Sequence, residues 1–200
     1  MDTQRFMGAD DTVLVEACKK GDLAAYEQLL QRYQRMLFNI AFRITGVYED
    51  ASDIVQDSLI AAWRRIDDFR GDAKISTWLT AIVVNNSRNR LKQRQQRQKV
   101  ELYSLDAPIP AGDGALPDLP SRSPSALAQL EASEMHGFLR RCVEALSQEF
   151  REVLVLRDMQ EIPYQEVAAA LQLREGTVKS RLFRAREAVR DCLKKTAGIS

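Results

Sequence analysis

The sequence predicts an all-α protein, with two small helical domains joined by a flexible, proline-rich linker. Apolar residues recur at helical spacing in two long stretches, and no strand pattern is convincing. The region between these stretches holds five of the six prolines, together with Gly112 and Gly114. The first stretch contains no proline. We therefore place the first domain at residues 10–100, the linker at 101–130 and the second domain at 131–195.

Composition sets limits on the class of protein. The chain has 200 residues, 45% of them hydrophobic, and a net charge of +1, so a packed core is expected. Cys18, Cys142 and Cys192 are far apart and odd in number, which favours packed thiols in a reducing compartment over a disulfide framework. The polar, acidic start does not resemble a signal peptide. No apolar run approaches the roughly 20 residues that span a bilayer, so we expect a cytoplasmic protein without membrane insertion.

The helices of the first domain follow from apolar spacing and capping residues. Asp22 can cap the second helix, and Gly46 can end it. Acidic residues in the first turn favour the start of the third helix. A turn-rich loop over 67–72 precedes the fourth. The four helices are expected at residues 11–19, from Asp22 to Gly46, at 49–66 and at 76–98.

The third predicted helix carries an acidic face. Asp50, Asp53 and Asp57 recur at i, i+3 and i+7, with Gln56 beside them. Three interpretations stay open for this face. The carboxylates could bind Mg²⁺ in a nucleic-acid enzyme, dock a basic partner helix, or form an ordinary solvated surface.

The fourth predicted helix has the opposite charge. Between Ala73 and Val100 there is no acidic residue. Lysine and arginine side chains can contact the phosphates of nucleic acid, and side-chain amides can pair with base edges. The cations are Lys74, Arg88, Arg90, Lys92, Arg94, Arg97 and Lys99, and the interleaved amides include Asn85 and Asn89.

Near the end of the chain, the pattern predicts a helix-turn-helix. Pro163 suits the first position of one helix, Gln172 and Leu173 make the turn, and the second helix runs over about 175–190. Its expected buried stripe is Val178, Leu182, Ala185 and Val189. Its other faces carry hydroxyl, guanidinium and aromatic groups, which suit the major groove of DNA.

Catalytic chemistry is not indicated. The sequence contains no Gly-rich phosphate loop and no nucleophile–histidine pair, and the lone His136 does not make a zinc site. We therefore predict no catalytic residue, no metal site and no cofactor, and a protein that is not an enzyme.

Two sets of motifs resemble the extracytoplasmic-function (ECF, group IV) type of the bacterial sigma-70 family. In the first domain they are Asp53-Ile54-Val55-Gln56-Asp57, Phe69-Arg70-Gly71-Asp72 and Thr77-Trp78-Leu79. In the second, GTVKSRLFRARE from Gly176 to Glu187 is similar to the fourth region of the family. The resemblance covers about residues 10–100 and 135–195.

This resemblance implies three functional surfaces. Asp53, Gln56 and Asp57 match the residues that dock on the β′ coiled coil of core RNA polymerase. The surface for the single-stranded −10 element would comprise Lys74, Asn85, Arg88 and Asn89, with Asn85 at the position that receives a flipped base. The surface for duplex −35 DNA would comprise Lys179, Ser180, Phe183 and Arg184.

The function implied by the resemblance is that of a dissociable sigma subunit. Such a protein would direct core RNA polymerase to specific promoters and promote DNA opening in a stress response. Its expected partners are core polymerase (β′ coiled coil and β flap), promoter DNA and an anti-sigma factor, and it would not be an obligate homo-oligomer. Two alternatives are an autonomous helix-turn-helix regulator that binds palindromic DNA as a dimer, and a Mg²⁺-dependent DNA-cleaving enzyme.

Overall fold

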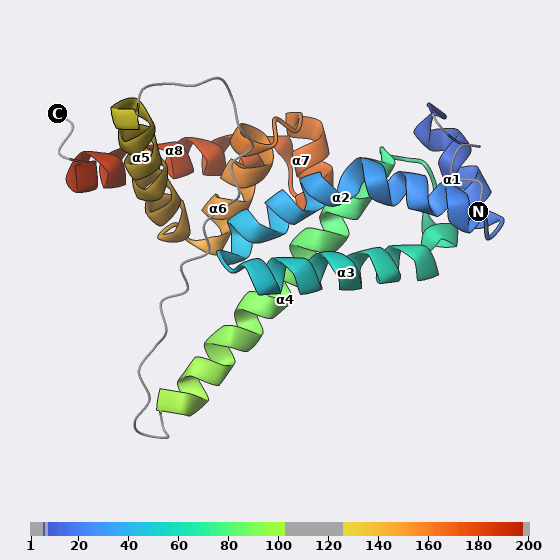
Figure 1. Cartoon of the computed structure of the whole chain (residues 1–200), viewed down its shortest axis with the longest axis horizontal. Helices are drawn as coiled ribbons and strands as arrows, with labels where there is room; N and C mark the ends of the chain where they lie inside the picture. Colours follow the sequence, from blue (N-terminus) through green and yellow to red (C-terminus); the bar gives the residue numbers. More distant parts are fainter. Residues whose placement is uncertain (1–5, 7, 103–125, 198–200) are drawn as a thin grey trace.

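Helices make up all the regular structure that the computed structural model describes (Figure 1). The described residues are 6, 8–102 and 126–197, and side chains are described for 6, 8–98 and 135–196. Within these ranges there is no β-strand. The predicted all-α fold class is confirmed.

The first domain is built from four α-helices and a short 3₁₀ turn. Asp22 caps α2 as expected, since its Oδ1 accepts hydrogen bonds from the backbone N–H of Ala24 (2.9 Å) and Ala25 (3.2 Å). Gly46 ends α2 in the left-handed conformation at φ 76°, which glycine adopts without steric cost. The elements are α1 (Asp11–Lys19), α2 (Leu23–Thr45), α3 (Tyr48–Arg64), the 3₁₀ turn Ile66–Asp68 and α4 (Ile75–Leu102).

The core of this domain lies between α2, α3 and α4, which pack against one another. Leu37 and Ile40 of α2 and Val83 of α4 are completely buried. The ring of Tyr26 on α2 lies 4.8 Å, centroid to centroid, from that of Trp63 on α3. The predicted apolar stripes thus face one shared core.

The second domain contains α5 (Ala126–Glu144), α6 (Gln148–Leu154), a π-helical turn (Val155–Met159), α7 (Tyr164–Leu171) and α8 (Glu175–Ala197). Pro163 precedes α7 as its N-cap rather than occupying its first helical position. Gln172 makes the turn in the left-handed conformation at φ 55°. All four residues of the predicted α8 stripe are buried, namely Val178, Leu182, Ala185 and Val189.

Two helices extend into the range predicted as linker. α4 ends at Leu102 and α5 begins at Ala126. The remainder of the predicted linker, at 103–125, lies outside the described residues.

The expectation of unpaired cysteines is wrong for two of the three. Cys142 on α5 and Cys192 on α8 form a disulfide, with a Cα–Cα distance of 5.7 Å. The pair is separated by 50 residues, and only the packing of α5 against α8 brings the two together. Cys18 is free and buried in the first domain, as predicted.

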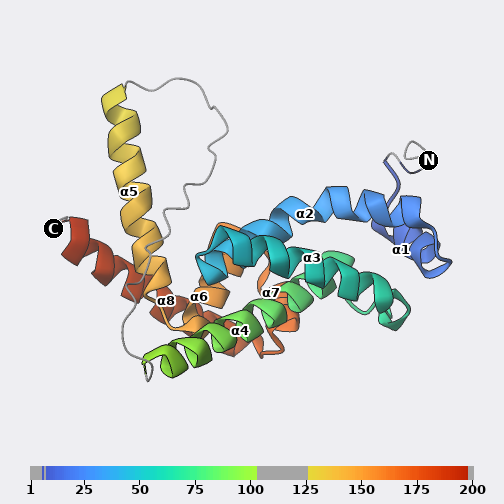
Figure 2. The same ribbon diagram turned by 60° about the horizontal axis from the view of Figure 1, so that its bottom comes forward.

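The two domains are in contact. α4 lies against α7, and α2 lies against the π-helical turn and α6. Figure 2 shows α4 crossing in front of the second domain, while α5 stands away from the body on the side of α8. The contact places basic α4 next to helices of the second domain.

Candidate nucleic-acid and partner interfaces

The outward face of α8 presents four side chains to solvent. Lys179, Ser180, Phe183 and Arg184 are all exposed, and Phe183 retains 63% of its accessible surface. The Ser180 hydroxyl donates to the backbone carbonyl of Thr177 at 3.0 Å, one turn earlier. Arg184 pairs with no carboxylate among the described side chains. These are the four residues predicted to contact −35 DNA, and they form one exposed patch, which we call the α8 face.

Two other arginines of α8 contact carboxylates of their own domain. Arg186 donates two hydrogen bonds to Asp158 of the π-helical turn, from Nε at 2.8 Å and Nη2 at 2.6 Å. These bonds raise the pKa of Arg186 above its ordinary value. Arg181 pairs with Glu149 of α6 at 2.7 Å. Both arginines therefore tie α8 to its own domain, which positions the α8 face.

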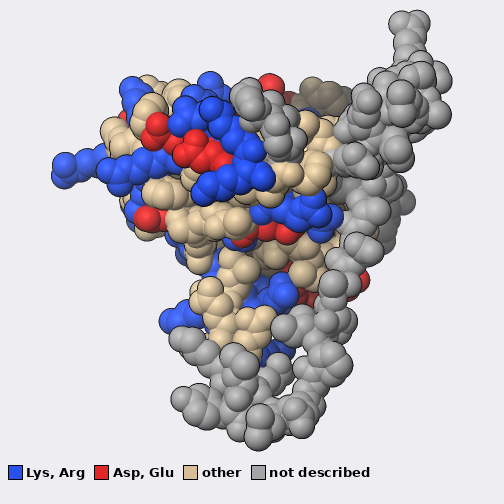
Figure 3. Space-filling model, turned by 90° about the vertical axis from the view of Figure 1, so that its left-hand side faces the viewer, with Lys and Arg blue, Asp and Glu red and all other residues tan. Residues whose placement is uncertain are grey.

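The end of the molecule that carries α5 and α8 is rich in cations. Figure 3 shows Lys and Arg side chains gathered over the upper part of this end, with a few acidic groups between them. Such a surface favours a polyanionic partner through long-range attraction.

On α3, three side chains of the predicted docking surface are exposed, namely Asp53, Gln56 and Asp57. We call this surface the α3 face. Asp50 departs from it, because this carboxylate is only 15% exposed and pairs with Arg90 (2.9 Å) and Arg94 (3.4 Å) of α4. Asp53 makes a longer contact with Arg90, at 3.4 Å. Asp50 of the predicted acidic face therefore pairs with arginines of its own domain instead of facing solvent.

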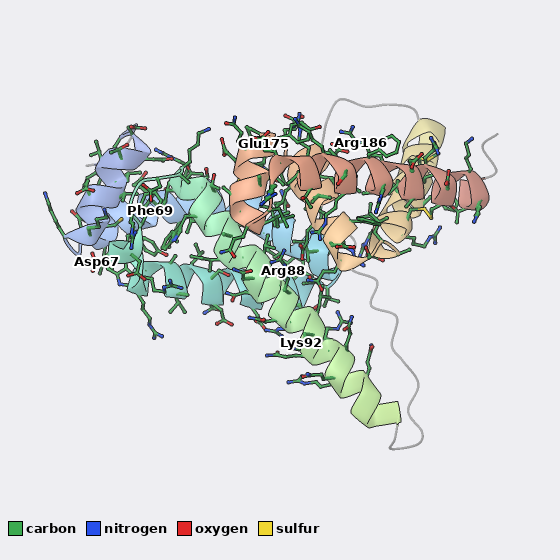
Figure 4. The ribbon with its side chains drawn as sticks, turned by 180° about the vertical axis from the view of Figure 1, so that it is seen from behind. Asp67, Phe69, Arg88, Lys92, Glu175 and Arg186 are labelled. Atoms are coloured by element: carbon green, nitrogen blue, oxygen red, sulfur yellow. A yellow bond between two sulfur atoms is a disulfide. The ribbon has the colours of Figure 1, made fainter. Side chains whose placement is uncertain are left out.

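The predicted −10 residues of α4 fall into two groups. Asn85 and Asn89 are exposed. Arg88 instead donates to Glu152 of α6, from Nε at 2.8 Å and Nη2 at 2.6 Å, and these hydrogen bonds raise its pKa. Lys74 donates to Glu166 of α7 at 2.7 Å. Figure 4 shows Arg88 where α4 passes the second domain and Lys92 farther along the projecting part of α4.

The sequence interpretation missed Glu152, Glu166 and Arg151. Glu152 is 2% exposed, and the signal that could have revealed it is an acid next to the apolar run Val153–Leu156. Arg151 donates to the carbonyls of Ile44 (2.7 Å) and Leu146 (3.0 Å). No local pattern distinguishes Glu166 and Arg151 from ordinary surface charges, since their partners lie in distant segments.

Two further properties concern the described residues alone. They contain no group of three or more His, Cys, Asp or Glu side chains arranged to hold a metal ion. None of their helices has the length and apolar character needed to cross a bilayer.

Two family models match the chain. The model for sigma-70 region 2 matches residues 29–97. The model for sigma-70 region 4 matches residues 139–189. The first covers the α3 face and the basic part of α4, and the second covers the α8 face.

Similar proteins were found over nearly the whole length. The RNA polymerase sigma-H factor of Pseudomonas aeruginosa is 33% identical over 180 residues, which cover 90% of this chain and 91% of that protein. The ECF RNA polymerase sigma-E factor of Salmonella typhimurium is 35% identical, with 90% and 92% covered. That of Escherichia coli K12 is 34% identical, with the same coverage.

Two solved structures share the fold. CnrH, in complex with the cytosolic domain of CnrY, matches with a TM-score of 0.65 and 26% identity, covering 93% of this chain and 98% of CnrH. The sigma factor RpoE of Bartonella quintana, in complex with the anti-sigma factor NepR, matches with a TM-score of 0.63 and 25% identity, covering 84% and 96%.

Proposed function

The chain belongs to the sigma-70 family, and from this premise we propose that it is a dissociable sigma subunit of the ECF type. It binds core RNA polymerase, directs it to specific promoters and promotes the opening of their DNA. It catalyses no covalent step itself and works in the cytoplasm.

The observation that carries the proposal is the separation of two exposed faces of opposite chemistry on rigid helices. The α3 face offers two carboxylates and an amide from one helix side. The α8 face offers one lysine, one arginine, a hydroxyl and an exposed aromatic ring. A regulator that acted alone on duplex DNA would need only the second. We assign the α3 face to the β′ coiled coil of core polymerase and the α8 face to the −35 element.

Reading of the −35 element follows from the side chains of the α8 face. Arg184 can bind a guanine edge with two hydrogen bonds, and Phe183 can contact a thymine methyl group. Lys179 and Ser180 can hold phosphates or base edges. Arg181 and Arg186 are engaged with Glu149 and Asp158, so we assign them to positioning of the helix.

The −10 surface is assigned to α4, through Lys74, Asn85, Arg88 and Asn89. Capture of an unstacked base must offset a few kcal/mol of lost stacking, and a basic surface with polar groups is suited to this task. The two surfaces engage one promoter together, which raises the effective concentration at the second site. Each contact alone can therefore be weak.

Regulation by an anti-sigma factor is part of the proposal. Of the two solved structures named above, RpoE is in complex with the anti-sigma factor NepR, and CnrH is in complex with the cytosolic domain of CnrY. The anti-sigma factor of this chain would cover both domains and keep them from core polymerase. If it were membrane-bound, it would hold the protein at the inner membrane.

Run-off transcription with purified core RNA polymerase tests the proposal. Promoter-specific transcripts should depend on addition of this chain. Tight binding to palindromic duplex DNA without polymerase would favour an autonomous regulator instead. Mg²⁺-dependent nicking of a plasmid would favour a nuclease.

A further inference from the structure

A disulfide joins α5 to α8 close to where both helices leave the core. Cys142 on α5 is 1% exposed, whereas Cys192 on α8 is partly exposed, and the bond spans 50 residues of sequence. The proposed function places the protein in the cytoplasm, where glutathione and thioredoxin keep thiols reduced. A disulfide in that compartment is typically transient and serves catalysis or redox sensing.

We infer that the Cys142–Cys192 bond is an exchangeable redox site. A cytoplasmic dithiol opens it, and the opening releases the joined ends of α5 and α8 while the α8 face stays in place. The redox state thereby sets how long the protein survives rather than which promoter it selects. The inference rests on the proposed function only for the compartment, because the chemistry and the packing of the site belong to the chain itself.

The two sulfurs differ in access, which decides where a reductant attacks. Cys192 lies near the end of α8, shortly before the exposed side chains of Lys194 and Lys195. Cations at this end of the helix attract an anionic thiolate. Cys142 belongs to the buried apolar core, and its sulfur lies 3.8 Å from the Thr196 hydroxyl. A thiolate therefore reaches Cys192 first, and Cys142 is the leaving group.

The exchange consists of two substitutions at sulfur. The first thiolate of the dithiol attacks the Cys192 sulfur, the Cys142–Cys192 bond breaks, and the Cys142 thiolate takes a proton from water. The second thiolate then attacks the reductant's own sulfur in the mixed disulfide, so that Cys192 leaves and is protonated. The reductant ends as a disulfide, and the protein has gained two electrons and two protons. Oxidised glutathione reverses the process and is itself reduced to two thiols.

The packing around the bond explains what its opening releases. Among the described side chains of α5 that precede Cys142, at 135–141, none is buried. On α8 beyond Val189, the side chains at 190–196 are likewise exposed or only partly buried. Helix ends with few buried apolar groups open at a low cost in free energy. The covalent bond therefore holds together two ends that pack weakly, and we call 135–141 and 190–196 the clamped ends.

The α8 face has supports of its own. Its last residue, Arg184, lies about 12 Å from Cys192 along the helix, at about 1.5 Å per residue. Leu182 and Ala185 are buried beneath the face. Ion pairs also join α8 to α6 and to the π-helical turn. None of these contacts involves a cysteine, so opening of the disulfide leaves the face in position.

Thiol labelling tests whether the bond exchanges in the folded chain. The full-length protein is equilibrated in glutathione buffers of increasing reduced fraction, quenched with acid, and then labelled in neutral denaturant with a maleimide–polyethylene glycol. The closed chain accepts one label, on Cys18, and the open chain accepts three, because the sequence holds three cysteines. We expect reversible conversion between the two forms, with the open form dominant when reduced glutathione is in large excess.

Proteases cut chain segments that open locally, so limited trypsin digestion tests what the opening releases. The clamped ends offer exposed cleavage sites at Arg141 on α5 and at Arg190 and Lys194 on α8. Lys179 and Arg184 are exposed sites on the α8 face. Initial cleavage at the clamped ends should become several-fold faster after reduction, and initial cleavage at the α8 face should not change. Mass spectrometry assigns the sites.

Two cysteine variants separate the disulfide from other effects of the reductant. Cys142→Ser combined with Cys192→Ser should be cut at the rates of the open form with or without reductant. Cys18→Ser is the matched control, since it removes the free thiol of the first domain and should keep the full response. If the double variant proves poorly folded by circular dichroism, the reduced wild type supplies the same comparison.

A bond that reduced glutathione opens only in unfolded chains would overturn the exchangeable site. Equal trypsin rates for the closed and open forms would overturn the release of the clamped ends. Faster cleavage at Lys179 and Arg184 after reduction would contradict the independent support of the α8 face. None of these measurements uses polymerase or DNA, so their failure is distinct from a failure of the proposed function, which run-off transcription reports separately.

Discussion

Arg90 of α4 donates a hydrogen bond to Asp50 of α3 at 2.9 Å, which joins the basic helix to the acidic one. Arg94, one turn further along α4, approaches the other oxygen of Asp50 at 3.4 Å. The two oppositely charged helices are therefore partners within one domain, and the exposed remainder of the acidic side is the α3 face.

Asp50→Asn should destabilise the first domain by about 1–2 kcal/mol, because two arginines lose the charge of a mostly buried acceptor. Urea unfolding followed by circular dichroism measures the loss. Asp57→Asn is the control and should change the free energy of unfolding by less than about 0.5 kcal/mol, as expected for an exposed side chain. Equal effects of the two substitutions would mean that the Asp50 contact adds nothing.

Asp57→Arg should weaken binding to core RNA polymerase by at least about 100-fold, since a like charge placed against a basic partner costs several kcal/mol. Co-purification and fluorescence titration with core enzyme measure the loss. Glu16→Arg makes the same charge change on α1, at another exposed site, and should bind normally. Retention of core by the Asp57 variant would remove the α3 face from the docking surface.

Arg184→Ala should reduce discrimination between −35 sequences by about 1–3 kcal/mol without changing stability, if the guanidinium reads a base edge. Transcription from a set of single-base −35 variants measures the discrimination. A uniform loss on every sequence would instead make Arg184 a phosphate contact.

Arg186→Ala should show the opposite behaviour. Two hydrogen bonds join Arg186 to Asp158 in an exposed ion pair. Loss of this pair should therefore cost about 0.5–1 kcal/mol of stability. Relative preference among −35 sequences should be kept, because the side chain holds the helix rather than the DNA. Thermal unfolding beside the same promoter set separates the two effects.

The three cysteines should differ in chemistry. Non-reducing peptide mapping should recover Cys142 joined to Cys192, and replacement of both by Ser should lower stability by up to about 4 kcal/mol, the chain-entropy value for a loop of 50 residues. Burial raises the pKa of the Cys18 thiol to about 11, so the protonated form persists well above neutral pH. Native Cys18 should therefore resist alkylation at pH 8, and rapid labelling there would contradict its burial.

Local rules account for the helices and the buried stripes. Asp22 and Gly46 set the limits of α2 through capping and a left-handed residue, which depend on a few neighbouring residues. The four buried positions of α8 follow from helical periodicity. The exposed side of α3 that carries Asp53, Gln56 and Asp57 also follows from periodicity, because these residues lie away from its apolar stripe.

Only the packing of helices decided which charges meet. Asp50 is not part of the exposed acidic surface because α4 lies beside α3 and supplies Arg90 as its partner. Arg186 pairs with Asp158, which faces it from the π-helical turn. The sequence by itself determined the helices, their buried faces and the sign of each surface, since these depend on spacing over one or two turns. The tertiary structure decided the pairing of Cys142 with Cys192 and of Arg88 with Glu152, because such partners are chosen by crossing helices whose separation along the chain carries no periodic signal.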